Sequence, residues 1–383
     1  MASIRKRTWQ SGGEEKTAWV ADYFDQSGKR HIKTFSTRKA ADAWLIRARD
    51  EVARGVHTPE NASITVADAA ELWMKRSELE GLEQSTLRQY RNHVALHINP
   101  RIGTETLARL TTPRVETFKD QLVGTRSRQM AGKVLTSLKS IITEAQRRGL
   151  VAHNAAAPVR IRTTGRENAR LKVGQDIPTK AEVQELIAAA KGRWRPFFVT
   201  AIFTGMRASE LRGLLWDDVD FDRKVVHVHQ RANLWGEIGA PKSAAGDREI
   251  PLAPMALSAL REWRLACPKG PLGLVFPNGQ GRVENHGNIL NRGWYPLQVA
   301  AGVVVPATGK QMTDAKYGLH STRHFFASWI IERGFSPKRC QVLLGHSSIT
   351  MTFDRYGHLF PSLEDDQAKF ADGEAALFGA AIG

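Results

Sequence analysis

The feature that most constrains this chain is a short run near its C-terminus, Leu343-Leu344-Gly345-His346, followed ten residues later by Tyr356. The glycine after two leucines predicts a helix end, which would fix the position of the histidine that follows. The tyrosine supplies a phenol that can attack a phosphorus atom, and the histidine supplies an N–H that can bind the same phosphate. A fold that uses this run must bring both side chains to one phosphate.

Four side chains further upstream suit the same chemistry. Arg207 follows Gly205, which allows a tight turn into a helix that starts near the arginine. Lys242 lies in a Pro-Lys-Ser turn before a probable strand. His320 and Arg323 stand at i and i+3, so on a helix they share a face.

Breaking a phosphodiester without a metal needs a nucleophile, positive charge on the phosphoryl oxygens and a proton for the leaving oxygen. A planar guanidinium can fork onto two phosphate oxygens, which suits Arg207 and Arg323 to the second task. The neutral form of His320, populated near pH 7, makes it the expected base toward the tyrosine proton. The phenol of Tyr356 is a poor nucleophile at neutral pH because its ordinary pKa is roughly 10, so it needs these neighbours.

Six residues together resemble the active site of the tyrosine recombinases, the phage-integrase family: Arg207, Lys242, His320, Arg323, His346 and Tyr356. The resemblance covers essentially the full length of the chain. It implies that Tyr356 forms a 3′-phosphotyrosine and that Lys242 protonates the leaving 5′ oxygen. It also implies that no cofactor and no metal takes part.

Several neighbouring residues keep more than one interpretation. Glu210, one turn after Arg207, either holds that arginine or is an ordinary helix residue. His324 is expected to point away from the site, from its spacing. The histidine at 358 is common in the family, and we assign it no step.

Composition agrees with a polyanionic partner. Among 383 residues, 55 are Lys or Arg and 39 are Asp or Glu, which gives a net charge of +16 and a pI of about 10.1. This balance favours nucleic acid first and an anionic membrane surface second. No apolar run reaches the ~20 residues of a spanning helix, and we find no signal peptide. Cys267 and Cys340 form neither a disulfide framework nor a zinc site, so we expect a soluble, intracellular protein located in the cytoplasm, at the bacterial nucleoid.

The length predicts two or three domains. Residues 1–58 are expected to form a small β-ribbon of three strands (4–9, 17–24 and 31–35) backed by a helix, followed by a linker at 55–63. The helix face is predicted from Ala40, Ala43, Trp44, Ile46 and Ala48. This part resembles the AP2-like arm-binding domain of many integrases. A ribbon of this kind suits a DNA groove.

Residues 64–160 read as an all-α domain, similar to the SAM-like core-binding domain of the family. A cap at residues 65–68 begins one helix, a second starts at 84–86, and residues 127–148 form a long third. Residues 161–177 are a basic linker.

Residues 178–383 are expected to be a mixed α+β catalytic domain of the DNA breaking-rejoining type. A cap at 179–182 begins its first helix, and residues 224–229 and 248–252 are strands. The Gly- and Asn-rich segments 268–293 and 302–316 look like loops. A tail helix within 361–383 docks either onto a neighbouring protomer, as the resemblance implies, or onto its own domain.

Basic side chains on the first two domains are candidate DNA contacts, although a solvated face explains roughly half of those on the helices. The candidates are Arg5, Lys6, Arg7, Lys29, Arg30, Lys33, Arg88, Arg91, Arg126, Arg128, Lys133 and Lys139.

The sequence therefore predicts a multi-domain, site-specific tyrosine recombinase, an integrase of a phage or integrative mobile element. The expected partners are double-stranded DNA attachment sites, three further copies in a tetramer on DNA, a DNA-bending protein and an excision factor, with no membrane. A type IB topoisomerase-like enzyme shares the Arg, Lys, His and Tyr chemistry, and a non-catalytic DNA-binding regulator is the third interpretation.

Overall fold

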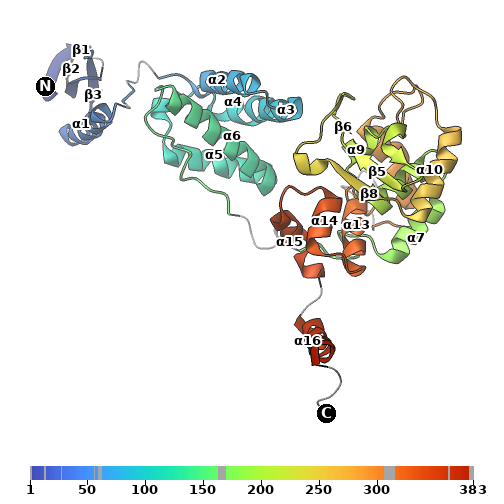
Figure 1. Ribbon diagram of the computed structural model, residues 1–383. Coiled ribbons are helices and arrows are strands. Elements are labelled where there is room, and N and C mark those ends of the chain that lie inside the picture. The colour runs from blue at the N-terminus through green and yellow to red at the C-terminus, as the bar shows by residue number, and fades with distance from the viewer. Residues whose placement is uncertain are drawn as a thin grey trace. The chain divides into compact units, whose positions relative to one another are not determined.

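The computed structural model describes residues 2–12, 14–26, 28–55, 57–58, 63–162, 170–305, 315–360 and 363–378. The chain divides into two compact units, Met1–Glu167 and Asn168–Gly383 (Figure 1). The first unit contains a small sheet and a helical bundle, and the second contains mixed helices and short strands. In the ranges given above, no helix is long and apolar enough to cross a membrane.

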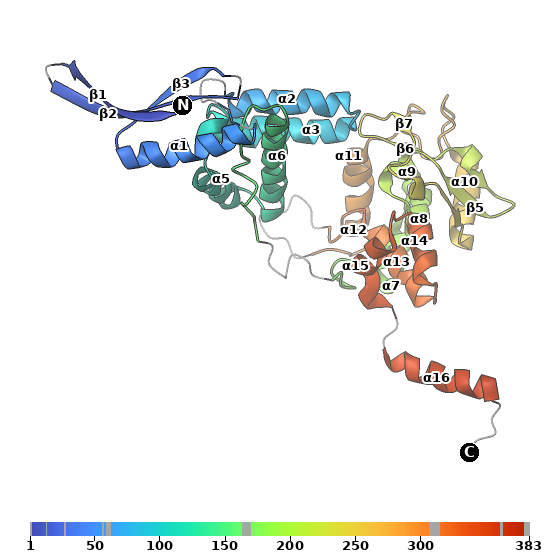
Figure 2. The same cartoon turned by 60° about the vertical axis from the view of Figure 1, so that its left-hand side comes forward.

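The first unit begins with a three-stranded antiparallel ribbon, in the order β1 (Ser3–Ser11), β2 (Glu14–Phe24) and β3 (Arg30–Phe35). Helix α1 (Arg38–Ala53) starts at Thr37, whose hydroxyl accepts from the N–H of Ala40, and packs along the ribbon (Figure 2). The predicted ribbon and helix are confirmed.

The predicted face of α1 is partly wrong. Ile46 is 69% exposed, whereas the buried positions are Ala41, Leu45 and Ala48. Leu45 forms the small core with Ala21 and Tyr23 of β2. Alanines bury too little apolar area to select a face, so the packed side is set by Leu45 and by Trp44, whose ring meets that of Tyr23 edge to face at 5.1 Å.

The helical part of the first unit begins where the sequence predicts. Thr65 and Asp68 form a reciprocal capping box at the start of α2, and the hydroxyl of Ser127 caps α6. The core between the helices contains Phe118, Leu138 and Ile141, all fully buried. The elements are α2 (Val66–Leu79), α3 (Gln84–His93), a π-helical turn (Val94–Ile98), α4 (Asn99–Ile102), a 3-10 turn (Leu107–Arg109), α5 (Thr112–Thr125) and α6 (Arg128–Arg147).

The second unit begins with α7 (Lys180–Ala189), whose predicted cap at Thr179 and Glu182 is present. Its three-stranded sheet has the order β4-β5-β8, and β6 pairs with β7 in a separate hairpin. Helices α13, α14 and α15 pack in succession on one side of the unit (Figure 1). The other elements are α8 (Trp194–Thr204), α9 (Ala208–Arg212), β4 (Val219–Asp220), β5 (Val225–Val228), β6 (Arg231–Ala232), β7 (Ile238–Gly239), β8 (Arg248–Pro251), α10 (Pro254–Ala266), α11 (His286–Asn288), α12 (Tyr295–Ala300), α13 (Ser321–Glu332), α14 (Pro337–Leu344), α15 (Ile349–Tyr356) and α16 (Leu363–Phe378).

The loop predicted over 268–293 is wrong in its last part, which is helical from His286 and continues as a π-helical turn, Ile289–Trp294. Ile289 is fully buried. A Cβ at Gly293 would lie 2.9 Å from the ring of Trp194, so this glycine lets the turn approach α8 closely. Of the second predicted loop, residues 306–314 lie outside the described residues.

Candidate active site

The C-terminal end of α14 gathers three arginines from different elements. Gly345 adopts the left-handed conformation (φ 62°) and ends the helix, as predicted. The last carbonyls of a helix have no partner within it and carry partial negative charge. In chain order, the carbonyls of Leu343, Leu344 and Gly345 accept hydrogen bonds from Arg248, Arg323 and Arg207. One helix end therefore fixes three guanidinium groups around a common space.

A single buried carboxylate, that of Glu210, lies among these arginines. It accepts from the side chain of Arg207 at 2.7 Å, from that of Arg248 at 2.9 and 3.4 Å, and from the backbone N–H of Arg207 at 2.9 Å. Burial acts to raise the pKa of Glu210, but Arg248 and Arg207 outweigh it and hold the pKa below its usual value. Of the two interpretations of Glu210, the one in which it holds Arg207 is correct. One carboxylate against three guanidiniums leaves an excess of positive charge.

Arg323, on α13, is the most deeply placed of the three, with 2% of its surface exposed. It donates to the carbonyl of Gly205 at 2.8 Å. Burial, reinforced by the nearby Arg207, lowers the pKa of Arg323 to about 9. Gly205 has φ 59°, and a Cβ there would lie 2.4 Å from the ring of Phe326, so the tight turn predicted before Arg207 does require glycine.

His346 follows the glycine that ends α14 and is 7% exposed. Its Nδ1 lies 2.9 Å from the hydroxyl of Thr352, and its ring is stacked on that of Tyr356 with 6.3 Å between centroids. Burial, together with Arg323 and other cations, lowers the pKa of His346 to about 3. The ring is therefore neutral near pH 7.

Tyr356 ends α15 and is only 1% exposed. Burial raises the pKa of its phenol to about 12, although Arg323, Arg355 and Arg207 act in the opposite direction. Its hydroxyl lies 2.7 Å from Nδ1 of His324. The expectation that His324 points elsewhere is therefore wrong.

The reason is where α13 begins. His320 is the N-cap residue, and the helix proper starts at Ser321. Residues four apart share a helix face, so His324 returns to the same side as His320, and their rings meet edge to face at 4.8 Å. Within residues 315–360, the histidine that forms a hydrogen bond with the hydroxyl of Tyr356 is His324, and none joins His320 to the phenol. His320 keeps an exposed surface, but partial desolvation and the nearby Arg323 and Arg207 lower its pKa to about 4.

Lys242 lies exposed on the turn between β7 and β8. The turn is compact, because Pro241 packs so closely on Gly246 that a Cβ there would lie 2.4 Å away. Arg248, at the end of the turn, was predicted only as a strand residue and is 5% exposed. The alternation of β8, in which residues 248 and 250 are buried and 249 and 251 exposed, is the signal that could have identified it as inward-facing.

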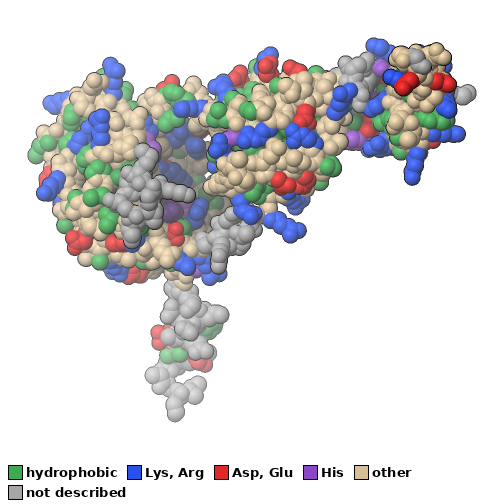
Figure 3. Space-filling model, turned by 180° about the vertical axis from the view of Figure 1, so that it is seen from behind, with side chains coloured by type: hydrophobic (Ala, Val, Ile, Leu, Met, Phe, Trp, Pro, Cys, Tyr) green, Lys and Arg blue, Asp and Glu red, His purple; other side chains and the backbone are tan. Residues whose placement is uncertain are grey.

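The candidate DNA-binding side chains of the first unit differ in whether they already contact another group of the protein. Arg5, Lys6 and Arg7 are exposed on β1. Figure 3 shows lysine and arginine side chains spread over this face of both units. The partnered candidates are Arg30 with Asp22, Lys33 over the ring of Trp44 at 4.9 Å, Arg91 with Glu78 at 2.6 Å, Arg128 with the carbonyl of Arg162 at 3.1 Å, Arg126 with the carbonyl of Thr125 at 3.3 Å and Lys139 with the carbonyl of Ala157 at 3.2 Å. Lys29, Arg88 and Lys133 are exposed.

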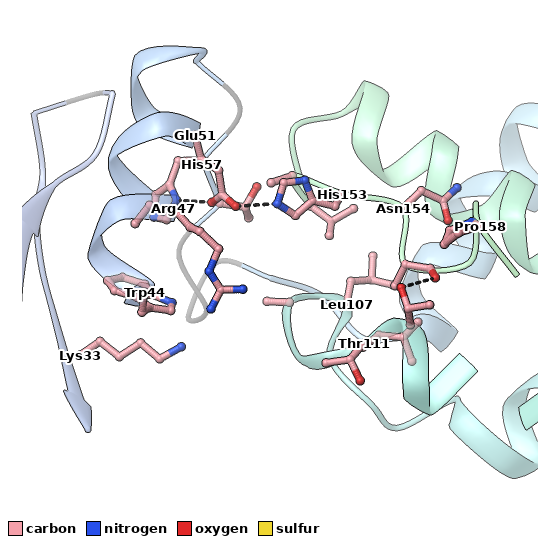
Figure 4. Close-up of a pocket in the computed structure, with 18 residues that line it drawn as sticks. Lys33, Trp44, Arg47, Glu51, His57, Leu107, Thr111, His153, Asn154 and Pro158 are labelled. Carbon is pink, nitrogen blue, oxygen red and sulfur yellow. Dashed lines mark hydrogen bonds and ion pairs between the residues drawn. The ribbon is translucent and has the colours of Figure 1, made fainter. Parts of the chain in front are cut away.

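A cavity of about 600 Å³ lies in the first unit, lined by side chains that include Lys33, Trp44 and Arg47 (Figure 4). At its edge, Glu51 accepts from His57 at 2.8 Å and from His153 at 2.7 Å. His57 was expected to belong to a linker but is 4% exposed. The Tyr356 cluster belongs to the other unit.

Comparison with known proteins agrees with this geometry. Residues 178–362 match the phage integrase family. A tyrosine recombinase XerC-like protein of Caldanaerobacter subterraneus subsp. tengcongensis is 24% identical, covering 88% of this chain and 90% of its own length. The putative prophage phiRv2 integrase of Mycobacterium tuberculosis is 27% identical, covering 89% of this chain and 88% of its own.

Two solved structures share the fold. The Tn1549 transposon integrase in complex with a circular intermediate DNA has a TM-score of 0.63 at 20% identity, covering 81% of this chain and 99% of that one. A lambda integrase tetramer bound to a Holliday junction has a TM-score of 0.58 at 20% identity, covering 86% and 94%. The match of residues 178–362 to the phage integrase family and the full-length relatives together support a tyrosine recombinase.

Proposed function

We propose that this chain integrates and excises a phage or other mobile DNA element at specific sites, with Tyr356 as the nucleophile. The observation that carries the proposal is a buried tyrosine near three arginines that one helix end holds, two of which also bind the carboxylate of Glu210. The surplus positive charge suits a phosphodiester whose oxygens gain negative charge during attack. Most of the catalysis would then be positioning and electrostatic stabilisation.

The proposed reaction begins when the Oη of Tyr356 attacks phosphorus, while Arg207 and Arg323 bind the non-bridging oxygens. The bond to the 5′ oxygen breaks, Lys242 supplies that oxygen with a proton, and a 3′-phosphotyrosine remains. His346 donates an N–H to the phosphate, which requires its proton on Nε2. The hydroxyl of Thr352, 2.9 Å from Nδ1, supports that tautomer by donating to Nδ1.

The surroundings of the tyrosine favour this function over its two alternatives. A DNA-binding regulator has no use for a phenol held among three arginines. A type IB topoisomerase-like enzyme would use the same residues but would need no defined site, so site dependence separates it from a recombinase.

The deciding experiment is covalent capture on nicked, labelled duplexes from candidate attachment sites. Wild-type protein should yield an adduct that survives SDS, and Tyr356→Phe should yield none while binding DNA equally well. Tyr295→Phe is the matched control, since this half-buried tyrosine lies on α12 outside the cluster, and it should react as wild type does. Failure of the wild type to form an adduct on any bound duplex would overturn the proposal.

We also propose the domain roles and partners that the resemblance implies. Residues 1–58 would bind arm-type DNA, 64–160 core-type DNA, 161–177 would be the basic linker and 178–383 the catalytic domain, within a homotetramer on DNA assisted by bending and excision factors. Phe370 and Leu377 of α16 are each 80% exposed, which suits docking onto a neighbouring protomer. Removal of residues 363–383 should therefore reduce the mass of the complex on DNA without affecting cleavage of a nicked half-site.

A further inference from the structure

The proton of the tyrosine hydroxyl has a defined partner in this structure. His324 presents Nδ1 to the Oη of Tyr356 at 2.7 Å, with the two rings tilted by 60°. The phenol is 1% exposed, so bulk water has little access to it. A nucleophile that must lose its proton in a buried place needs an acceptor within hydrogen-bond reach.

The charge state of His324 suits an acceptor. Burial, then the nearby His320, Arg355 and Arg323, lower its pKa to about 4, with Asp176 acting in the opposite direction. The ring is therefore neutral near pH 7. A neutral imidazole whose Nδ1 accepts from a phenol carries its own proton on Nε2.

We propose that His324, rather than His320, is the catalytic residue that takes the proton of Tyr356 as its oxygen bonds to phosphorus. The Oη–H bond breaks and its proton moves to Nδ1 of His324, while the Oη–P bond forms and the P–O5′ bond breaks. The leaving oxygen takes its proton from Lys242. In the return step the 5′ hydroxyl gives its proton to Lys242 as its oxygen bonds to phosphorus, the Oη–P bond breaks, and the imidazolium gives its proton back to the Oη of Tyr356. The inference rests on the proposed function, because it takes Tyr356 as the nucleophile.

The same arrangement makes the basicity of His324 depend on whether DNA is bound. Arg323 and Arg355 disfavour a positive charge on His324. A bound phosphodiester offsets these cations, so the imidazolium that forms during attack becomes less costly. The base would then reach its working strength only on DNA, which protects the tyrosine from ionising without a target.

Asparagine separates basicity from hydrogen bonding at this position. Its Oδ1 lies where Nδ1 of histidine lies and accepts a hydrogen bond, but it takes up no proton near neutral pH. His324→Asn should reduce single-turnover cleavage of a nicked duplex by roughly 10²- to 10⁴-fold, as expected for loss of a general base. Its rate should rise steadily with pH above 7, because ionisation of the phenol must then come from solvent. DNA affinity by gel shift should stay unchanged.

His320→Asn is the matched control one helical turn away. If it, and not His324→Asn, shows the pH-dependent loss, the proposal is overturned, as it is if both variants cleave at the wild-type rate. If wild-type protein also forms no adduct, the proposed function itself has failed, which is a different result. Should His324→Asn not bind DNA, His324→Gln replaces it with the same expected loss.

A sulfur leaving group distinguishes the base from the acid. A duplex with a 5′-bridging phosphorothiolate needs no proton on its leaving group, so it should restore cleavage by Lys242→Ala. The same duplex should leave His324→Asn slow, because the phenol still has to lose its proton. Recovery of His324→Asn on this duplex would assign His324 to the leaving group and overturn the inference.

Discussion

Two buried carboxylates of this protein each hold arginines, one in each unit, and they differ in what else those arginines bind. Glu144 on α6 is 3% exposed and binds Arg76 at 2.5 Å and Arg148 at 2.8 Å. The side chains of these two arginines are 36% and 44% exposed. Glu210 is 2% exposed; of its two partners, the side chain of Arg248 is 2% exposed and that of Arg207 is 36% exposed.

The difference shows how a protein rich in arginine can hold some of its guanidinium groups in fixed positions. Around Glu144 the arginines reach a carboxylate from solvent and can return to water. Around Glu210, Arg207 and Arg248 also donate to carbonyls at the end of α14. Each of these guanidiniums therefore has a fixed orientation before any phosphate arrives, which is the condition for electrostatic preorganisation.

Removing the charge of each carboxylate should give the largest difference in local stability between the two units. Glu210→Gln leaves the buried guanidinium of Arg248 without its counter-ion, so we expect a local loss of about 3–5 kcal/mol. Glu144→Gln should cost about 1–2 kcal/mol, because its arginines can be rehydrated. Hydrogen exchange of α9 and α14 in the first variant, and of α6 in the second, measures each loss.

Covalent cleavage supplies the functional contrast. Glu210→Gln should cleave slowly because its arginines are no longer held, and Glu144→Gln should cleave at the wild-type rate. Equal losses of local stability in the two variants would show that burial of the carboxylate matters and that the helix-end carbonyls add nothing.

Acid should weaken the second unit through its buried histidines. The pKa of His346 falls from its ordinary 6.5 to about 3 through burial and nearby cations. Between these values the unfolded chain binds a proton that the folded chain does not, so the free energy of unfolding is full above pH 6.5 and falls as the pH decreases toward 3. From pH 7 to pH 5 the loss is about 2 kcal/mol for one such histidine.

In His346→Gln, the free energy of unfolding should depend less on pH. It is measured by urea unfolding of the full chain, followed by hydrogen exchange in α14 and α15. The first unit offers a comparison, since burial also lowers the pKa of His93 there. His93→Gln should flatten the response of α3 and leave that of α14 unchanged. A flattening of both units by either variant would mean that they unfold together.

The glycines that end α14 and α6 allow a second comparison of the two units, in which the backbone conformation is similar but the surroundings differ. Gly345 and Gly149 both have positive φ, 62° and 70°. A Cβ at Gly345 would lie 2.9 Å from the carbonyl of Ala245 and from the guanidinium of Arg248, whereas at Gly149 it would meet nothing within 4 Å. Gly149→Ala should cost about 1 kcal/mol from the backbone alone, and Gly345→Ala somewhat more.

Cleavage rates separate the two glycine variants more clearly than stability does. Gly345→Ala displaces Arg248 and the carbonyl that holds Arg207, so we expect slower adduct formation. Gly149→Ala should form the adduct as wild type does. A normal rate in Gly345→Ala would show that the end of α14 tolerates displacement.

Much of the fold could be predicted because local chemistry decides it. The caps at Thr65 and Thr179 and the glycine ends at Gly205 and Gly345 are local signals, and all four are present in the structure. The face of α1 was mispredicted because it depends on which residues of the ribbon it meets. Such tertiary packing is not encoded in the helix alone.

The residues of the site were likewise predictable only in part. Motif spacing identified residues that the structure brings together, among them Arg207, Arg323 and Tyr356. It missed Arg248, whose role appears only when β8 lies against the end of α14. It also misplaced His324, although residues four apart share a helix face just as residues three apart do, so the spacing itself favoured the side of His320.

Exposed arginines on α3 give the smallest effect and test the idea that a free charge, not a paired one, meets DNA. Arg88 and Arg91 are both exposed and stand three residues apart on one helix, but Arg91 is paired with Glu78 at 2.6 Å. A phosphate contact contributes a slope of about one in the logarithm of affinity against that of salt concentration. Arg88→Ala should reduce the slope by about this amount. Arg91→Ala should change it less, because the arginine must first leave its carboxylate. An equal change for both would mean that the Glu78 pair opens at no cost on DNA, and that ion pairing in the free protein does not predict which arginines bind.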